Sequence, residues 1–236
     1  MILQCNNLFK AYKKNVFVIN NLNLTLPKGR IIGLLGPNGC GKSTLIKMIA
    51  GVLQPTKGSI LVDGKEVGHQ SKAVVSYLPE RPYFDPAMKV SELLRYFEEF
   101  YEDFDRERAN RLLRDLSIDP EAKLKILSKG TKEKVQLILV MSRKAKLYLL
   151  DEPIAGVDPA AREYILSTIV SNYDSEATIL ITTHLITDVE QVLDEFIFFS
   201  WGGRVLKSGN ADEERTRSGM SLDELFKEVY RCSQSF

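Results

Sequence analysis

Apolar and polar positions alternate in short runs over the first 28 residues of the chain. The runs, at residues 2–9, 16–19 and 22–26, are separated by turns that contain Asn, Lys and Pro. Such alternation between polar turns is typical of β-strands that pair with their neighbours. The pattern therefore predicts a small antiparallel sheet at the start of the chain.

Beyond this region, short apolar runs alternate with segments of helical character. The apolar runs predict strands at residues 30–35, 59–64, 73–78, 147–150 and 178–182. The helical segments are residues 45–50, 159–170 and 222–230. Strands and helices that follow each other in turn favour a parallel sheet. Residues 196–201 and 204–207 predict a final hairpin across Gly202-Gly203.

Residues 89–144 differ from the segments on either side. Their apolar residues recur at helical spacing, first over positions 90–101 and again over positions 112–116. We interpret residues 89–144 as a helical subdomain, inserted into a core that comprises residues 1–88 and 145–236. The chain is then a single domain in which the core also carries the N-terminal antiparallel sheet.

The composition narrows the class of protein. The 236 residues carry a formal net charge of +1, so no overall electrostatic attraction to nucleic acid is expected. No apolar stretch approaches the roughly 18 residues that span a bilayer, and the first residues lack the apolar region of a signal peptide. We therefore expect a cytoplasmic protein. Its three cysteines, Cys5, Cys40 and Cys232, lie far apart, which fits reduced thiols.

Residues 36–44 read Gly-Pro-Asn-Gly-Cys-Gly-Lys-Ser-Thr and have the spacing of a phosphate-binding loop. The glycines let backbone N–H groups close around phosphate oxygens, and a helix that begins here directs its positive dipole end at the same anion. Lys42 is expected to reach the β- and γ-phosphates, and Ser43 to bind Mg²⁺. An ordinary glycine turn is the alternative. The predicted nucleotide-binding residues are Gly36, Pro37, Asn38, Gly39, Cys40, Gly41, Lys42, Ser43 and Thr44.

The apolar run at residues 147–150 ends in two adjacent carboxylates, Asp151 and Glu152. At the tip of a strand, Asp151 can hold Mg²⁺ directly or through its water shell. Glu152 can orient and polarise the water that attacks the γ-phosphate. A strand that runs into a solvated turn gives the same pattern in many proteins, but its occurrence after a phosphate loop favours catalysis.

Together with the segment Leu127-Ser128-Lys129-Gly130-Thr131 and with His184, these motifs resemble the ATP-binding cassette of ABC transporters over nearly the whole chain. The resemblance implies an α/β phosphate-loop NTPase of the ABC type, with a parallel-sheet core, an N-terminal antiparallel β subdomain and an inserted helical subdomain. It also implies ATP and Mg²⁺ as cofactors, and hydrolysis of ATP to ADP and phosphate.

The family's Leu-Ser-Gly-Gly-Gln signature is matched here at Leu127, Ser128 and Gly130, whereas Lys129 and Thr131 depart from it. The resemblance implies that Ser128 and Gly130 contact the γ-phosphate bound by a second ATP-binding subunit. A capped helix start on a basic face is the structural alternative.

Two further matches lie in the first half of the chain. Tyr12 stands where the family places an aromatic ring that stacks on adenine, although an aromatic at a sheet edge also serves packing. The segment at residues 77–80 matches the family's Q-loop, with Glu80 in place of glutamine. The resemblance implies that Glu80 binds Mg²⁺ or a water in the catalytic site, and an exposed loop acid is the alternative.

Two more matches lie in the second half. Residues 154–158 resemble the D-loop, in which Asp158 crosses the interface between the two subunits, and Asp158-Pro159 is equally a good helix start. His184 follows a predicted strand and matches the switch histidine that senses the γ-phosphate. A satisfied loop histidine is its alternative.

The resemblance implies two kinds of partner: a separate transmembrane permease subunit, and a second ATP-binding subunit in a homodimer or a close heterodimer. The chain is similar to single-cassette subunits of bacterial exporters, which lie on the cytoplasmic face of the plasma membrane. Two other classes stay open. One is a soluble ABC-type ATPase that acts on ribosomes or DNA, and the other is a nucleotide-dependent binding module without turnover.

Overall fold

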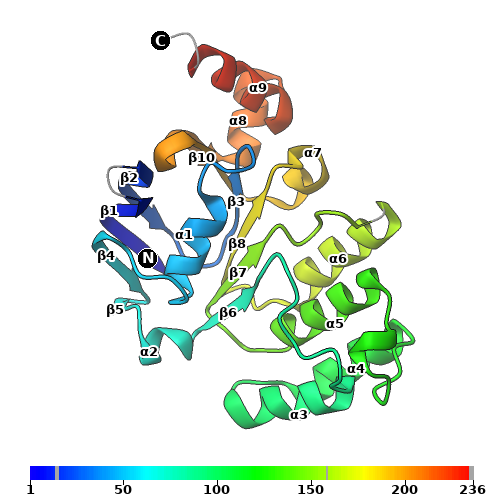
Figure 1. Ribbon diagram of the computed structural model, residues 1–236. Helices are drawn as coiled ribbons and strands as arrows, with labels where there is room; N and C mark the ends of the chain where they lie inside the picture. Colours follow the sequence, from blue (N-terminus) through cyan, green and yellow to red (C-terminus); the bar gives the residue numbers. More distant parts are fainter. Residues whose placement is uncertain (14–15, 158, 234–236) are drawn as a thin grey trace.

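Among residues 1–13, 16–157 and 159–233, which the computed structural model describes, the strands form two β-sheets, one of four strands and one of six (Figure 1). The N-terminal sheet has the order β2-β1-β4-β5 and is antiparallel. Its strands are β1 (Leu3–Lys13), β2 (Val16–Leu26), β4 (Lys57–Val62) and β5 (Lys65–Glu66). The predicted antiparallel sheet is confirmed, and the tight turn at Asp63-Gly64 joins β4 to β5 within it.

The larger sheet has the order β10-β9-β3-β8-β7-β6. Its strands are β3 (Ile31–Leu35), β6 (Val75–Leu78), β7 (Leu147–Asp151), β8 (Thr178–Thr183), β9 (Glu195–Ser200) and β10 (Arg204–Asn210). All neighbours are parallel except β10, which runs antiparallel to β9. The predicted parallel core and final hairpin are therefore confirmed. Trp201, expected at the end of a strand, instead begins a 3₁₀ turn (Trp201–Gly203) between β9 and β10.

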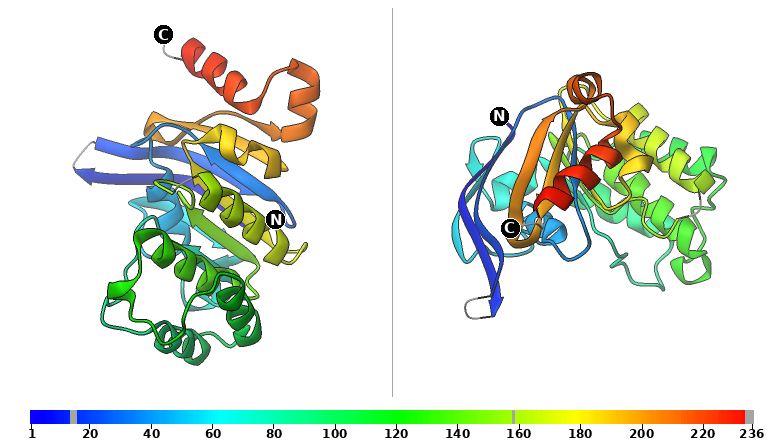
Figure 2. Two further views of the ribbon diagram at one scale, coloured as in Figure 1. Left: turned by 90° about the vertical axis from the view of Figure 1, so that its right-hand side faces the viewer. Right: turned by 90° about the horizontal axis from the view of Figure 1, so that it is seen from above.

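The helices cover both faces of the larger sheet, and the two C-terminal helices lie beside β10 (Figures 1 and 2). They are α1 (Lys42–Ile49), α2 (His69–Lys72), α3 (Val90–Phe100), α4 (Arg106–Asp115), α5 (Lys129–Met141), α6 (Pro159–Asn172), α7 (Ile186–Val189), α8 (Ala211–Ser218) and α9 (Leu222–Ser233). Two further 3₁₀ turns are Leu124–Ile126 and Glu190–Val192. Among the described helices, none has both the length and the apolar character that crossing a membrane requires.

The core lies on the two faces of the larger sheet because successive residues of a strand point to opposite sides. In β3, Ile32 and Leu34 pack with α1 and the N-terminal sheet, whereas Ile31 and Leu35 pack with α5, α6 and the C-terminal elements. The inner strands β3, β7, β8 and β9 are thus buried on both faces, which explains why they are mostly apolar throughout. Because β3, β7 and β8 are parallel, their carboxyl ends lie at the same edge of the sheet.

The helices α3, α4 and one face of α5 have an apolar cluster of their own, which includes Val90, Leu93, Phe97 and Leu112. They lie below the sheet as green ribbons in the left view of Figure 2. Arg143 ties this region to the sheet: its Nη1 donates to the carbonyl of Val75 at 2.6 Å. This helical layer is therefore anchored to the start of β6.

Candidate functional site

The loop between β3 and α1 requires glycine at several positions, among them Gly36 and Gly41. At Gly36, a Cβ would lie 2.2 Å from the carbonyl oxygen of Phe199, so no larger residue fits there. Gly41 has φ +110° and forms the N-cap of α1. The helix begins at Lys42, earlier than the apolar pattern indicates, so the N–H groups of its first turn face the loop.

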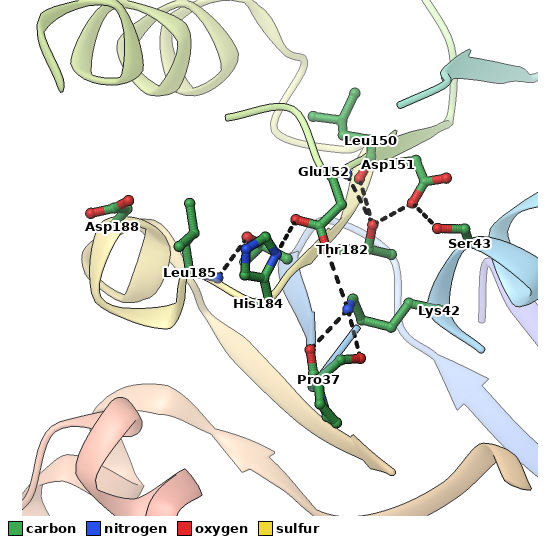
Figure 3. Close-up of polar contacts among 12 residues, drawn as sticks. Pro37, Lys42, Ser43, Leu150, Asp151, Glu152, Thr182, His184, Leu185 and Asp188 are labelled. Atoms are coloured by element: carbon green, nitrogen blue, oxygen red, sulfur yellow. Dashed lines mark hydrogen bonds and ion pairs between the residues drawn. The ribbon is translucent and has the colours of Figure 1, made fainter. Parts of the chain in front are cut away.

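Lys42 points back into this loop and is almost fully buried. Its Nζ donates to the carbonyl oxygens of Gly36 at 2.8 Å and Pro37 at 3.2 Å, and it lies 3.2 Å from Oε1 of Glu152 (Figure 3). Loop carbonyls and a carboxylate therefore fix the position of the ammonium group. A positive charge is held at the centre of the loop.

Ser43 and Asp151 meet at the carboxyl end of β7. The Ser43 hydroxyl donates to Oδ1 of Asp151 at 2.9 Å, and the Thr182 hydroxyl donates to the same oxygen at 2.7 Å. Burial raises the pKa of Asp151, and the two hydrogen bonds act in the opposite direction. The other oxygen, Oδ2, is buried and has no hydrogen-bond partner among the described residues.

This pair of residues fits a Mg²⁺ ion, because carboxylate and hydroxyl oxygens are ligands that this ion accepts. A buried carboxylate oxygen without a protein partner is costly unless a cation or water satisfies it. Over the described residues, no group of three or more His, Cys, Asp and Glu side chains forms a metal cage. Mg²⁺ bound through one or two protein ligands commonly takes its others from phosphate and water.

Glu152 follows Asp151 in a left-handed backbone conformation, with φ +51°. Such a conformation costs on the order of 1–3 kcal/mol for a residue other than glycine. The backbone N–H of Glu152 stabilises this conformation by donating to the backbone oxygen of Thr182 at 3.0 Å. The nearly buried carboxylate lies between Lys42 and His184. Its Oε1 is 3.2 Å from Nζ of Lys42, and its Oε2 is 3.0 Å from Nδ1 of His184 (Figure 3).

A cavity of about 400 Å³ opens over these groups. Its lining residues are Val18, Asn38, Gly39, Gly41, Lys42, Ser43, Thr44, Glu80, Glu152, Ala155 and His184. The structure thus brings the loop together with the predicted Glu80, Glu152 and His184. Tyr12 lies at the edge, exposed, with its hydroxyl 3.3 Å from Oγ1 of Thr44. Cys40 is buried in the loop, and burial raises the pKa of its thiol.

The signature residues do not line this cavity. Ser128 is the N-cap of α5, and its Oγ accepts a hydrogen bond from the Thr131 N–H at 3.1 Å. Gly130 has open space where a Cβ would stand. Within this chain the segment acts as a capped helix start, so a contact with a second subunit's nucleotide stays a prediction. Asp158 lies outside the described residues.

Thr182 is a site residue that the motifs did not reveal. It lies directly opposite Asp151 in the pairing of β7 with β8. From there it contacts both acids, as donor to Asp151 and as acceptor from the Glu152 N–H. The available signal was the polar pair Thr182-Thr183, which follows the apolar residues 179–181 at the end of β8.

A glycine-rich loop between a strand and a helix, with an acid at the end of a neighbouring parallel strand, defines a phosphate-loop protein of the α/β class. A family model described as "ABC transporter" matches residues 19–155. The "ABC transporter ATP-binding protein YtrB" of Bacillus subtilis (strain 168) is 30% identical over 239 residues, which cover 100% of this chain and 77% of YtrB.

A second relative, the "SkfA peptide export ATP-binding protein SkfE" of the same organism, is 30% identical over 207 residues, covering 85% of this chain and 86% of SkfE. A solved structure described as "Structure of ATP binding subunit of ABC transporter" superposes with a TM-score of 0.86 at 29% identity, covering 98% of this chain and 100% of that one. The chain therefore belongs to the ABC transporter family and is similar to its ATP-binding subunits.

Proposed function

We propose that this chain is the ATP-hydrolysing subunit of an ABC transporter and that it drives a conformational change in separate membrane subunits. The observation that carries the proposal is the position of Glu152, whose carboxylate is held between Lys42 and His184 at the cavity over the phosphate loop. A carboxylate in this place can accept a proton from a water that attacks phosphate.

ATP binding follows from the loop. Its backbone N–H groups, the first turn of α1 and the Lys42 ammonium together present positive charge to a triphosphate. Tyr12 offers an exposed ring beside Thr44, which supports adenine stacking at this edge. Positive charge and aromatic surface thus match the two ends of ATP.

Mg²⁺ would be held by Ser43 and Asp151, with Glu80 among the residues that line the cavity. The ion, when bound, neutralises charge that develops on the phosphates during transfer. Thr182 orients Asp151, and its second contact to the Glu152 backbone keeps the two acids in fixed relation. His184 fixes the side chain of Glu152 from the other side, so that Glu152 is positioned before a water arrives.

Closure of two ATP-binding subunits would complete the site. Ser128 and Gly130 lie at the start of α5, outside the cavity of their own chain, which suits a contact in trans. Lys129 adds an exposed positive charge there and lies near Gly156, where a Cβ would be 3.1 Å from its Nζ. In this proposal Asp158 crosses the same interface, and residues 89–144 move against the core as a helical subdomain.

The membrane partner would dock at a groove of about 470 Å³ beside the Q-loop. Aromatic and basic side chains line it, including Tyr77, Tyr83, Phe97, Tyr101, Lys47, Lys72 and Arg81. Among the described residues, these two lysines and Arg81 form no ion pair. The similarity to SkfE favours export, with the chain on the cytoplasmic face of the plasma membrane.

Purification of the tagged chain from gently solubilised native membranes tests the transporter role. We expect a polytopic membrane protein in stoichiometric amount, identified by mass spectrometry. The variant Tyr83→Ala, in the groove, should lose this partner and keep its ATPase activity, whereas the exposed Lys57→Ala should keep both. Recovery only with ribosomes or DNA would overturn the transporter role and leave the ATPase assignment standing.

A further inference from the structure

The strand β9 and the turn that follows it lie against the phosphate loop from the side opposite β8. β9 pairs with β3 as far as Leu35, which faces Phe198. One residue further, the carbonyl of Phe199 approaches Gly36 so closely that a Cβ would lie 2.2 Å from it. The start of the loop therefore rests on the end of β9.

The turn Trp201–Gly203 is itself held in place. Gly203 packs on β2, where a Cβ would lie 3.0 Å from the Cα of Ile19. On its other side, Arg204 pairs with Ser200 as β10 returns along β9. The turn therefore packs between the N-terminal sheet and the phosphate loop, and these contacts fix the backbone from which the Trp201 side chain extends.

Trp201 covers the middle of the phosphate loop with its indole ring. A Cβ built on Gly39 would lie 3.3 Å from this ring, closer than an ordinary van der Waals contact, so the ring lies directly over the glycine and leaves little room for a side chain there. Gly39 lines the cavity that we assign to the nucleotide. The Trp201 side chain remains 55% exposed, so part of the ring covers the loop and part faces solvent.

We propose that Trp201 is a positioning residue for nucleotide binding: its indole ring packs against Gly39 and keeps the phosphate loop in the conformation that receives phosphate. This inference rests on the proposed function. A loop that is already ordered loses less conformational freedom when it binds, and affinity rises accordingly. Removal of the ring should therefore weaken nucleotide binding and leave the chemistry of Glu152 unchanged.

The first test uses the protein's own fluorescence. The chain contains one tryptophan, so its tryptophan emission reports on Trp201 alone. We expect MgADP to change this emission and the change to saturate with the dissociation constant that calorimetry gives for the same titration. Emission that stays constant while calorimetry records saturation would overturn the proposal.

The second test compares Trp201→Leu with Trp201→Phe. We expect Trp201→Leu to raise both the KM for ATP and the Kd for MgADP about tenfold, equivalent to about 1.4 kcal/mol, with kcat within twofold of the wild type. Trp201→Phe should restore most of the affinity, because a flat ring again covers Gly39. Phe100→Ala, at an exposed aromatic on α3, is the matched control and should change neither constant.

The outcomes separate this inference from the proposed function. If calorimetry detects no binding of MgATP or MgADP by the wild type, the proposed function fails. If the wild type binds and Trp201→Leu binds within twofold of it, only the role of Trp201 fails. Circular dichroism shows whether Trp201→Leu is folded. If it is not, the tryptophan emission of the wild type and the nucleotide affinity of Trp201→Phe decide whether Trp201 has the proposed role.

Discussion

The carboxylate of Glu152 lies 3.2 Å from the ammonium of Lys42. Because both side chains are almost fully buried, water screens this ion pair little, and each group depends on the other for charge compensation. Lys42 belongs to the phosphate loop and Glu152 follows β7, so the pair connects the predicted phosphate-binding loop to the predicted catalytic carboxylate. Thr182 and His184, at the end of β8, complete the arrangement.

Lys42→Ala should abolish detectable nucleotide binding. The substitution removes the one buried cation of the loop and leaves Glu152 without its closest positive charge. Isothermal titration with MgADP measures the effect, and Lys57→Ala on the exposed side of β4 serves as control. A Kd within threefold of the wild type would show that the loop binds phosphate without this lysine.

Asp151→Asn should raise the Mg²⁺ concentration that gives half-maximal ATPase activity at least about tenfold. The amide keeps the shape of the side chain but loses the negative charge that the ion requires. ADP binding measured in EDTA should stay close to the wild-type value, which separates loss of the ion from loss of the fold. An unchanged Mg²⁺ requirement would remove Asp151 from the metal site.

Asp63 should stabilise the fold in a pH-dependent way. Lys146 and Lys28 each lie 2.7 Å from its carboxylate, and their hydrogen bonds lower its pKa to about 2. The folded-state pKa is therefore below the value of about 3.9 in an unfolded chain, so the contribution is present above pH 4 and is lost as the pH falls towards 2. Urea unfolding should show Asp63→Asn destabilised at pH 7 and the difference from wild type shrinking below pH 4. An equal difference at pH 7 and pH 3 would count against this account.

Arg143→Leu should lower the free energy of unfolding by about 3–5 kcal/mol, the usual cost of breaking a buried ion pair. Arg143 is 2% exposed, and it bonds to Asp103 at 2.9 Å as well as to backbone carbonyls next to β6. Arg143→Lys should not rescue it, because an ammonium lacks the planar set of donors. Urea denaturation measures the effect, with the exposed Arg95→Leu expected to change stability by less than about 0.5 kcal/mol. A similar loss of unfolding free energy in Arg143→Leu and Arg95→Leu would show that the contacts of Arg143 do not stabilise the fold.

The sequence predicted the sheets and the phosphate loop because each rests on local information. An apolar run of five residues before a glycine-rich loop indicates a buried strand wherever it occurs, and the carboxyl ends of parallel strands share one edge. Thr182 was missed because its role depends on the register that sets it opposite Asp151. No local pattern encodes that register.

The helix α8 was also missed, for a different reason. Its residues 211–218 are polar nearly all round, so no apolar stripe marks them, and only Ala211 and Glu214 are buried. The available signal was Asn210, whose side chain accepts hydrogen bonds from the first-turn N–H groups of Asp212 and Glu213. The sequence pattern places Trp201 in a strand because it follows the apolar run at residues 196–199 with only Ser200 between them. Its contact with Gly39 is tertiary.

In the proposed function, Glu152 activates the water that attacks ATP. The steady-state ATPase rate of Glu152→Gln, measured beside the wild type and with ATP binding determined on the same samples, tests this role. The amide keeps the size of the side chain but cannot accept the proton. We predict Mg²⁺-dependent hydrolysis by the wild type and a rate at least about 100-fold lower in the variant, with ATP binding retained and an ATP-bound dimer accumulating. A variant that binds ATP and hydrolyses it at the wild-type rate would contradict the account.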